Sequence, residues 1–252
     1  MSSERFIDLQ ALWGATHGVP AAERMRAIFR HAQVDCYDEH AYWVRTPRVA
    51  IVGVGGLPVK LRENQAHLLG QPVTLETLEQ QLKEMMGYCG FMSYLNPKDK
   101  SPRALTETML SLGHASTAHA FSLNLLVLGI SAAVETELCC QRDLVHLSRV
   151  TVARTAAQDD PSFVVLDETH LSTLQELRRQ TIERLDAIEG SREARNTLFP
   201  ASKATMVLIT GSIRNLQKLT AARDDLGKEE EYRRLLSAIV RLLTPLSPEL
   251  FS

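Results

Sequence analysis

The stretch that most constrains the fold is a short apolar segment that ends at a glycine and leads directly into a helix. Met206 to Ile209 are four consecutive apolar residues between two threonines, and Gly211 follows them closely. A run this short, stopped by glycine, is typical of a buried strand. Ser212 suits the N-cap of a helix beginning at Ile213, because its hydroxyl accepts a hydrogen bond from a free N–H of the first turn. The sequence therefore predicts a strand that passes straight into a helix.

Three arginines accompany this strand and helix, namely Arg195, Arg214 and Arg223. A guanidinium presents a rigid fork of donors that suits phosphate groups and pyrimidine carbonyls. Arg214 and Arg223 are nine residues apart in the sequence, which is about two and a half helical turns, so they point from different faces. Most charged residues are simply solvated, and the residues alone leave both interpretations open.

The composition narrows the partners that the chain can have. Its 252 residues are 44% hydrophobic and 23% charged, as in a globular protein with one large core or two small ones. The net charge of −2 gives no reason to expect a nucleic-acid polymer or an acidic membrane as partner, so an anion must be met by locally placed arginines. The four cysteines form no C-x-x-C pair, which favours reduced thiols in a cytoplasmic protein. We expect no metal site, because the aspartate pair at 159–160 has no third carboxylate at ligand spacing.

The spacing of apolar residues, together with the positions of glycine and proline, predicts the remaining helices and strands. We expect residues 1–45 to form an N-terminal helical appendage and residues 46–252 to form the main domain. The predicted strands lie at 48–54, 121–128, 162–166 and 206–209. Three predicted helices begin after Pro20, at Gly129 and at Ile213, and another ends at Gly113. Three more cover 74–86, 168–189 and 228–243. The apolar faces of 168–189 and 228–243 suit either subunit packing or an ordinary core.

Polar groups gather just before the strand at 121–128. His114, Ser116, Thr117 and His119 lie there within six residues, although a histidine after a helix-ending glycine is often structural. Farther along, Arg142 and Arg154 are twelve residues apart, and both can reach one anion if the chain doubles back between them.

The order of these pieces resembles the flavin-dependent thymidylate synthases over roughly residues 104–250. Members of that family carry an Ala-Arg-x-x-Leu-Pro element, a threonine-bearing strand, an Asn-x-Arg-Ser-Leu helix start and then a Leu-Arg pair. With one residue inserted before the proline, the matching residues are Ala194, Arg195, Leu198, Pro200, Thr205, Arg214, Leu216 and Arg223. Upstream, the segment from Gly113 to Ser116 is similar to the family's Gly-His-x-Thr flavin segment. Arg142 and Arg154 have the interval of the first and last arginines in its signature.

Departures from the signature identify a divergent member of that family. Asp143 and Leu144 stand where the family has histidine and arginine. Arg149-Val150 replaces an Asn-Glu pair, Val152 a serine, Thr155 a tyrosine and Ser212 an asparagine. One divergent branch methylates UMP as well as dUMP in nucleoside-antibiotic synthesis of the polyoxin type, and changes around the sugar and flavin pockets fit such a shift in substrate.

The resemblance implies an α/β fold of the α+β type, with helices packed on a mostly antiparallel sheet. It implies FAD-dependent C5 methylation of UMP or dUMP, with methylenetetrahydrofolate as one-carbon donor and NADPH as cosubstrate, in a homotetramer that builds each site from several subunits. The implied nucleotide-binding residues are Arg142, Arg154, Arg195 and Arg223, and Arg223 would also act in catalysis by bonding the uracil. The implied flavin-binding residues are His114, Ser116, His119, Ser212 and Arg214.

Two other functions stay open at this point. A catalytically silent nucleotide-binding subunit is favoured by the departures at Asp143 and Val150 and opposed by the four retained arginines. A flavin-dependent hydroxymethylation of a pyrimidine nucleotide is the second. A bound yellow chromophore would separate the silent protein from both enzymes, and the mass of the product would separate the two enzymes.

Overall fold

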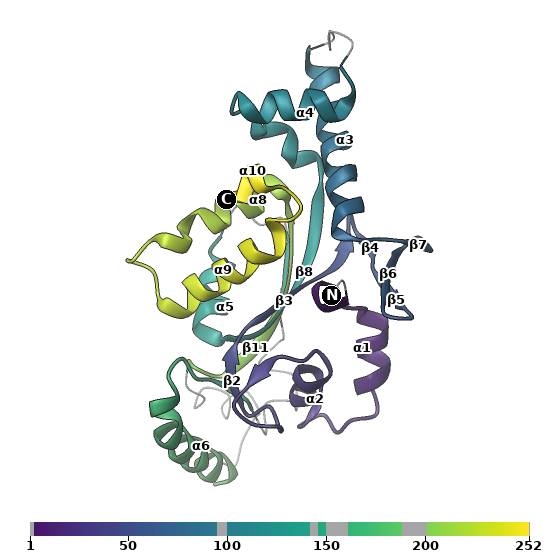
Figure 1. Cartoon of the computed structure of the whole chain (residues 1–252). Helices are drawn as coiled ribbons and strands as arrows, with labels where there is room; N and C mark the ends of the chain where they lie inside the picture. Colours follow the sequence, from purple (N-terminus) through teal and green to yellow (C-terminus); the bar gives the residue numbers. More distant parts are fainter. Residues whose placement is uncertain (1–2, 95–99, 142–145, 150–160, 188–200, 252) are drawn as a thin grey trace.

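The centre of the protein is a five-stranded antiparallel sheet with the strand order β4-β3-β8-β11-β9 (Figure 1). The computed structural model describes residues 3–94, 100–141, 146–149, 161–187 and 201–251. The strands are β3 (Arg48–Val54), β4 (Leu57–Pro58), β8 (Ser122–Ser131), β9 (His146–Arg149) and β11 (Ala204–Ser212). With helices on both faces, this sheet confirms the predicted fold class.

The central strand β8 is buried on both faces. Leu123, Leu125 and Val127 belong to one apolar cluster, whereas Leu126 and Leu128 belong to another. Side chains alternate between the two faces of a strand, so the clusters lie on opposite sides of the sheet. This is why the segment contains almost no polar residue: a strand covered on both faces is apolar at nearly every position.

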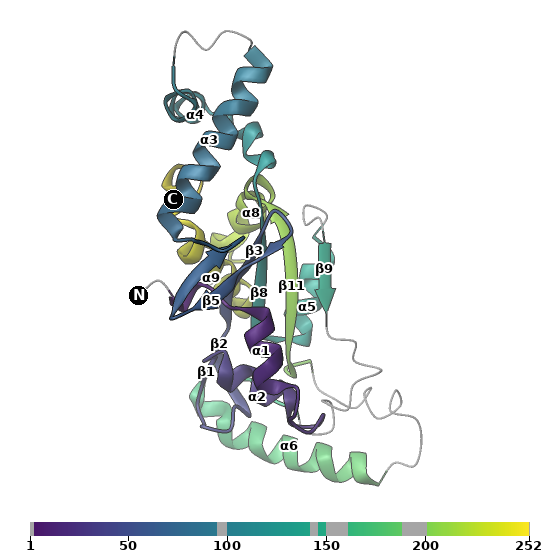
Figure 2. The ribbon, with the colours of Figure 1, turned by 90° about the vertical axis from the view of Figure 1, so that its right-hand side faces the viewer.

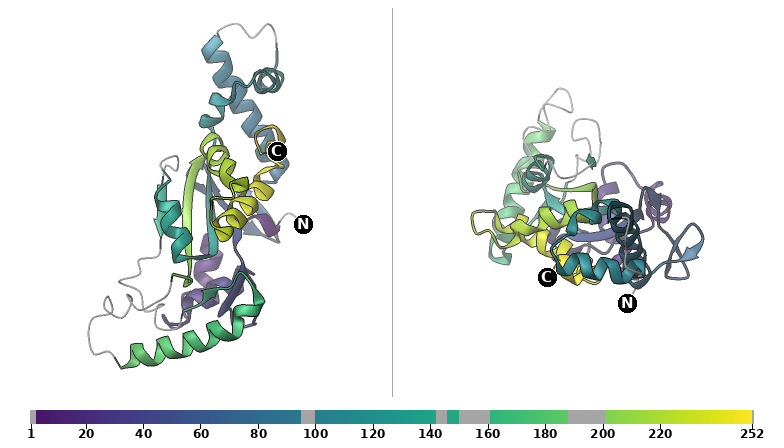
Figure 3. Two further views of the ribbon diagram at one scale, coloured as in Figure 1. Left: turned by 90° about the vertical axis from the view of Figure 1, so that its left-hand side faces the viewer. Right: turned by 90° about the horizontal axis from the view of Figure 1, so that it is seen from above.

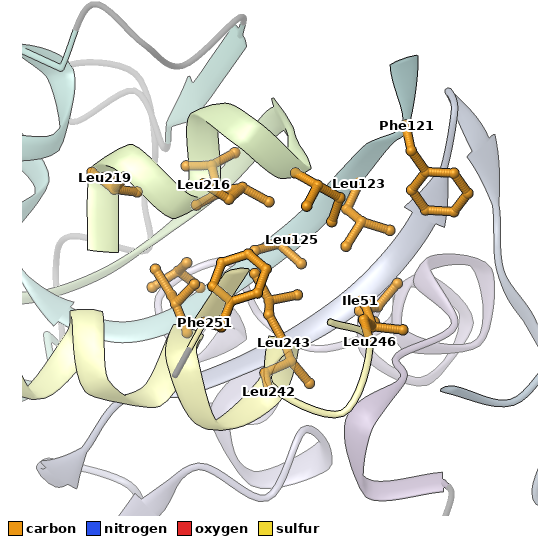
Figure 4. Packing of buried hydrophobic residues seen from close by; sticks show 14 of the residues in the cluster. Ile51, Phe121, Leu123, Leu125, Leu216, Leu219, Leu242, Leu243, Leu246 and Phe251 are labelled. Atoms are coloured by element: carbon orange, nitrogen blue, oxygen red, sulfur yellow. The ribbon is translucent and has the colours of Figure 1, made fainter. Parts of the chain in front are cut away.

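Helices near the C-terminus cover the first face. They are α8 (Ile213–Thr220), the 3-10 helix η6 (Ala221–Asp224), α9 (Glu230–Leu243) and α10 (Pro248–Phe251). Figure 4 shows leucines of α8 and α9 meeting Leu123, Leu125 and Ile51 of the sheet. The apolar face that the sequence predicts in 228–243 is therefore used in the core, where Leu235, Leu236 and Ile239 are fully buried.

Elements from the first part of the chain cover the second face. They are η1 (Ser3–Arg5), α1 (Leu9–Thr16), α2 (Arg24–His31), β1 (Asp35–Cys36) and β2 (Trp43–Thr46). Phe29 and Val44 are fully buried against Leu126 and Leu128 of β8. Figure 2 shows α1 and α2 in front of the sheet and α9 behind it. The domain boundary at residue 45 stays a prediction.

A small second sheet links α6 to this part of the chain. Its order is β1-β2-β10, with β10 (Phe163–Val164) parallel to β2. The helices η5 (Glu168–His170) and α6 (Leu171–Asp186) follow. The guanidinium carbons of Arg26 on α2 and Arg178 on α6 lie 4.2 and 4.1 Å from the centre of the Tyr42 ring, which is within the range of cation–π attraction.

A helical arm extends from the opposite end of the molecule (Figure 3). It consists of α3 (Leu75–Tyr94) and α4 (Pro102–Ser111), and it leads into the 3-10 helix η2 (Ala115–Ala120). The hairpin strands β5 (Lys60–Arg62), β6 (Gln65–Leu68) and β7 (Gln71–Pro72) precede it. α3 is longer than predicted because Gly87 does not end it: a Cβ there would lie 2.1 Å from the Pro102 carbonyl oxygen, so the glycine lets α4 approach. Leu112, the residue that follows α4, is 67% exposed.

The structure corrects the prediction that a helix begins at Gly129. β8 continues through this residue to Ser131, and α5 (Ala132–Cys139) begins after it with Ser131 as N-cap. Opposite β11, the pairing shifts between Leu128 and Ile130, so Gly129 is the extra residue of a β-bulge. Its φ of +74° is in the left-handed region, where glycine costs least. Because of this bulge, Ile130 joins the same cluster as Leu125.

No helix among the described residues is long and apolar enough to cross a bilayer.

The bulge predicts that Gly129→Ala destabilises the protein by about 2 kcal/mol. A left-handed alanine costs about 1–2 kcal/mol, and the new Cβ would lie 2.8 Å from a Val44 methyl carbon. Urea unfolding at equilibrium measures the change. Gly14→Ala in α1 is the matched control, because no atom lies within 4 Å of that Cβ and alanine favours a helix. An unfolding free energy equal to that of the wild type in Gly129→Ala would show that the bulge carries no strain.

A buried carboxylate joins α9 to the end of β8. Glu231 is 7% exposed, and its Oε1 accepts a hydrogen bond of 2.6 Å from the Ser131 backbone N–H. Burial raises the pKa of the Glu231 carboxyl above its ordinary value, and the Ser131 hydrogen bond only partly offsets this. A folded-state pKa above the unfolded one means that the folded state holds the proton more tightly, so the associated stability is lost as pH rises through the folded pKa.

We therefore expect the unfolding free energy of the wild type to fall, relative to that of Glu231→Gln, as pH rises from below the ordinary glutamate pKa to pH 8. The amide accepts the same hydrogen bond without burying a charge. Parallel urea titrations across this range measure the difference, with Glu39→Gln as control because the Glu39 side chain is 86% exposed. Identical pH profiles for wild type and Glu231→Gln would contradict the assignment.

Candidate functional site

Two segments that are far apart in the sequence meet at the end of the sheet nearest the helical arm. β8 begins there and β11 ends there, since Ser122 pairs with Ser212. η2 leads into β8 and α8 follows β11, so antiparallel pairing sets the two helices side by side. The Ile213 backbone N–H donates to the Phe121 carbonyl over 2.9 Å and fixes their junction.

Ser212 has two roles at this junction. Its hydroxyl oxygen accepts a hydrogen bond of 3.1 Å from the Asn215 N–H and caps α8, as the sequence predicts. The same oxygen lies 3.0 Å from Nδ1 of His119 on η2. Ser212 is 5% exposed, whereas His119 is exposed, so the buried serine holds an imidazole that remains accessible from outside.

The five residues predicted to bind flavin lie on these two segments. His114 immediately precedes η2, Ser116 and His119 are on it, and Ser212 and Arg214 begin α8. His114 and Ser116 are exposed. Arg214 is half-buried and donates to the side-chain carbonyl of Gln217, one turn farther along α8.

Two further polar residues lie at the same end of the sheet: Thr117, which sequence reasoning noted without giving it a role, and Asn124, which it missed. Thr117 has a buried hydroxyl without a hydrogen-bond partner among the described residues. Asn124 interrupts the apolar pattern of β8, and its Oδ1 accepts a hydrogen bond of 3.0 Å from the Thr210 hydroxyl. Asn124 was detectable as the one polar residue inside an apolar strand, whereas the isolation of Thr117 depends on packing.

Arg223 lies at the other end of α8, on η6. Eight helical residues separate the two ends by about 12 Å. The Nε of Arg223 donates to Asp224 Oδ2 over 3.1 Å, and its side chain is 28% exposed. Four residues after η6, the Nζ of Lys228 lies 2.8 Å from Glu137 Oε1 of α5. That hydrogen bond raises the pKa of Lys228, which keeps the ammonium charged.

Arg223 lines a hollow of about 480 Å³ between α9, η6 and the turn from β2 to β3. Three further arginines line it, so we refer to it as the arginine hollow. Its lining residues are Thr46, Pro47, Arg223, Asp224, Glu230, Arg233, Arg234, Ser237, Ala238 and Arg241. The other three predicted nucleotide-binding residues, Arg142, Arg154 and Arg195, lie outside the described residues.

The double role of Ser212 predicts different outcomes for two substitutions. Ser212→Ala removes the cap and should lower the unfolding free energy by about 1 kcal/mol, whereas Ser212→Asn should retain most of it, because asparagine caps as well as serine. Thermal and urea unfolding measure both. If alanine and asparagine prove equally stable, the cap contributes nothing to stability.

Comparison of the chain with known proteins identifies its family. The family model described as "Thymidylate synthase complementing protein" matches residues 73–249. The flavin-dependent thymidylate synthase of Mycobacteroides abscessus is 25% identical over 198 residues, covering 68% of this chain and 77% of that protein. The enzyme of the same name from Mycolicibacterium gilvum is 22% identical over 194 residues, covering 68% and 78%.

Solved structures show the same fold. The Helicobacter pylori flavin-dependent thymidylate synthase, determined with FAD and dUMP, superimposes with a TM-score of 0.54 and 19% identity, covering 67% of this chain and 92% of that one. The UMP/dUMP methylase PolB of Streptomyces cacaoi, determined with 5-bromo-dUMP, gives a TM-score of 0.59 and 12% identity, covering 83% and 94%. The chain therefore belongs to the thymidylate synthase complementing protein family, which confirms the resemblance that its sequence shows to the flavin-dependent thymidylate synthases.

Proposed function

We propose that this protein is an FAD-dependent enzyme that methylates C5 of a uridine monophosphate, UMP or dUMP. The observation that carries the proposal is the contact between His119 and Ser212, because it joins the two segments that carry all five candidate flavin residues. Relatives of this family are named flavin-dependent thymidylate synthases, and the two similar solved structures hold dUMP or its 5-bromo analogue.

The donors at the junction of η2 and α8 suit FAD. A flavin dinucleotide offers phosphate and carbonyl acceptors, and the accessible His114, Ser116 and His119 side chains can donate to them. The partnerless hydroxyl of Thr117 is a further donor that a ligand could satisfy. Bound FAD, once reduced by NADPH, would supply the electrons that turn the transferred one-carbon unit into a methyl group.

Arg223 has the part of a catalytic residue in this proposal. Its guanidinium donates to a pyrimidine carbonyl and stabilises the negative charge that develops on the base as C5 becomes nucleophilic. Asp224 holds its Nε, and within the described part of the chain no other residue bonds its two terminal nitrogens, which can therefore bind a ligand bidentately. Arg142, Arg154 and Arg195 are the partners of Arg223 in holding the nucleotide, some of them through the 5′-phosphate. Methylenetetrahydrofolate is the one-carbon donor and NADPH the reductant, and the protein orients these reactants without a nucleophile of its own.

The proposed assembly is a homotetramer whose subunits share each site. The length of α8 supports this, because the flavin residues gather at its N-terminal end and Arg223 follows its C-terminal end on η6. The four cysteines form no C-x-x-C pair, which supports reduced thiols in a cytoplasmic protein.

The first test is the absorbance spectrum of the purified protein, followed by titration with FAD in the presence of UMP or dUMP. We expect a flavin band and tighter binding of one nucleotide, which names the substrate. Arg223→Ala should weaken nucleotide binding at least tenfold, since a hydrogen bond from a charged donor is worth about 1.5–3 kcal/mol, and should leave the flavin band intact. His119→Ala should weaken FAD instead.

Two exposed residues that belong to neither set of candidate residues provide controls, His170→Ala on η5 and Arg62→Gln on β5. Absence of flavin under every condition would favour the silent nucleotide-binding subunit, to which the lost signature residues at Asp143 and Val150 point. A product heavier by a hydroxymethyl rather than a methyl group would favour hydroxymethyl transfer. Unchanged nucleotide affinity in Arg223→Ala would refute its contact with the base.

A further inference from the structure

The polar face of α9 carries more positive charge than an ordinary solvated helix face. Arg234, Ala238 and Arg241 follow one another at helical spacings of four and three residues, and Arg233, Ser237 and Arg241 at spacings of four and four. These positions share one side of the helix. The small residues Ser237 and Ala238 lie between the arginines along the helix. Their short side chains leave space that the longer arginine side chains surround, and this space is the arginine hollow.

The opposite wall of the hollow comes from a distant part of the chain. Thr46 and Pro47, in the turn between β2 and β3, line it together with Arg223 of η6. Three separate segments therefore surround the same space. The polar face of an ordinary amphipathic helix is open to solvent and is not enclosed by other segments. This enclosure distinguishes the arginine hollow from an ordinary solvated helix face.

The charges that line the hollow do not balance. Arg223 is paired with Asp224 and Arg234 with Glu230, and Arg234 also donates to the Leu166 carbonyl over 3.2 Å. Among the described residues, Arg233 and Arg241 form no ion pair, and the buried Nε of Arg233 finds no hydrogen-bond partner there. Four guanidiniums thus face two carboxylates, Asp224 and Glu230.

Neighbouring like charges raise the free energy of a folded protein, and a buried donor without a partner adds to the cost. Both costs disappear if a doubly charged anion occupies the space between Arg233 and Arg241. A planar guanidinium binds tetrahedral oxyanions bidentately. The remaining charge of +2 is therefore equal in magnitude and opposite in sign to that of a phosphate dianion.

We propose that the arginine hollow is a binding site for a phosphate dianion, with Arg233 and Arg241 as its principal ligands. Arg234 and Arg223, each held by its own carboxylate, border the site. The proposal does not depend on flavin binding. The phosphate can belong to the pyrimidine nucleotide proposed above, whose base Arg223 would contact at the rim, or to a separate phosphorylated molecule.

The test is calorimetric titration of the full-length protein with inorganic phosphate, in chloride buffer of constant ionic strength. We expect Arg233→Gln/Arg241→Gln either to weaken phosphate binding at least tenfold or to lower the number of phosphates bound per chain by one. Arg62→Gln, an exposed arginine on β5, is the matched control and should bind as the wild type does. Circular dichroism and a urea titration establish that each variant is folded.

A second variant tests the same site without removing the arginine side chains, whose packing contributes to the fold. Ala238→Glu places a carboxylate on the floor of the hollow and should abolish the same binding event by charge repulsion alone. If phosphate binds to both variants as it does to the wild type, or does not bind to the wild type at all, the proposal is wrong.

Repeating the titration with saturating UMP or dUMP identifies the source of the phosphate. Competition means that the hollow holds the phosphate of the nucleotide itself, and additive binding means that it serves a second molecule; either result supports the site. The spectrum reports flavin binding separately, so a protein without flavin that still binds phosphate through Arg233 and Arg241 would refute the proposed enzyme and keep this site.

Discussion

Burial of β8 on both faces is the constraint on which the other elements depend. A strand with leucines and valines on each side needs two covers, and the chain supplies them from its two ends: α1, α2 and β2 on one face, and α8, α9 and α10 on the other. Gly129 adjusts this arrangement, because the bulge turns Ile130 back toward the face of Leu125 and brings Ser131 to the start of α5. Glu231 of α9 then bonds the Ser131 N–H, so one short segment joins the sheet to two helices.

The candidate flavin residues inherit their positions from this sheet. Pairing of Ser212 with Ser122 fixes where β11 ends relative to where β8 begins. This pair therefore sets the positions of the residues at the junction of η2 and α8. The buried Ser212 oxygen is shared between a helix cap and the His119 imidazole. A fixed serine thereby orients a histidine that stays accessible, which is what a residue needs if it is to meet a ligand in a defined position.

Local chemistry decided how much of this arrangement the sequence could predict. The strand around Met206–Ile209, the cap at Ser212 and the helix after it depend on neighbours in sequence, and the structure has them as predicted. Gly129 was misjudged because glycine marks both the end of a strand and a bulge within it, and only pairing with β11 distinguishes the two. The arginine hollow was beyond sequence reasoning for a related reason: Thr46 and Arg241 are almost two hundred residues apart, and each is ordinary by itself. Arg142, Arg154 and Arg195 stay predictions, since they lie outside the described residues.

Electrostatics explains why charged side chains must be placed locally in this protein. With a net charge of −2, the chain has no general attraction for anions, and at physiological salt a charge is screened beyond about 8 Å. Arg214 lies at one end of α8 and Arg223 beyond the other, and each has its own partner, Gln217 for Arg214 and Asp224 for Arg223. A ligand that is charged at several points must therefore find a cluster at each point, and a single diffuse basic surface would not serve. In the arginine hollow, carboxylates neutralise two of the four guanidiniums, which lowers their mutual repulsion while leaving Arg233 and Arg241 the charge that an anion requires.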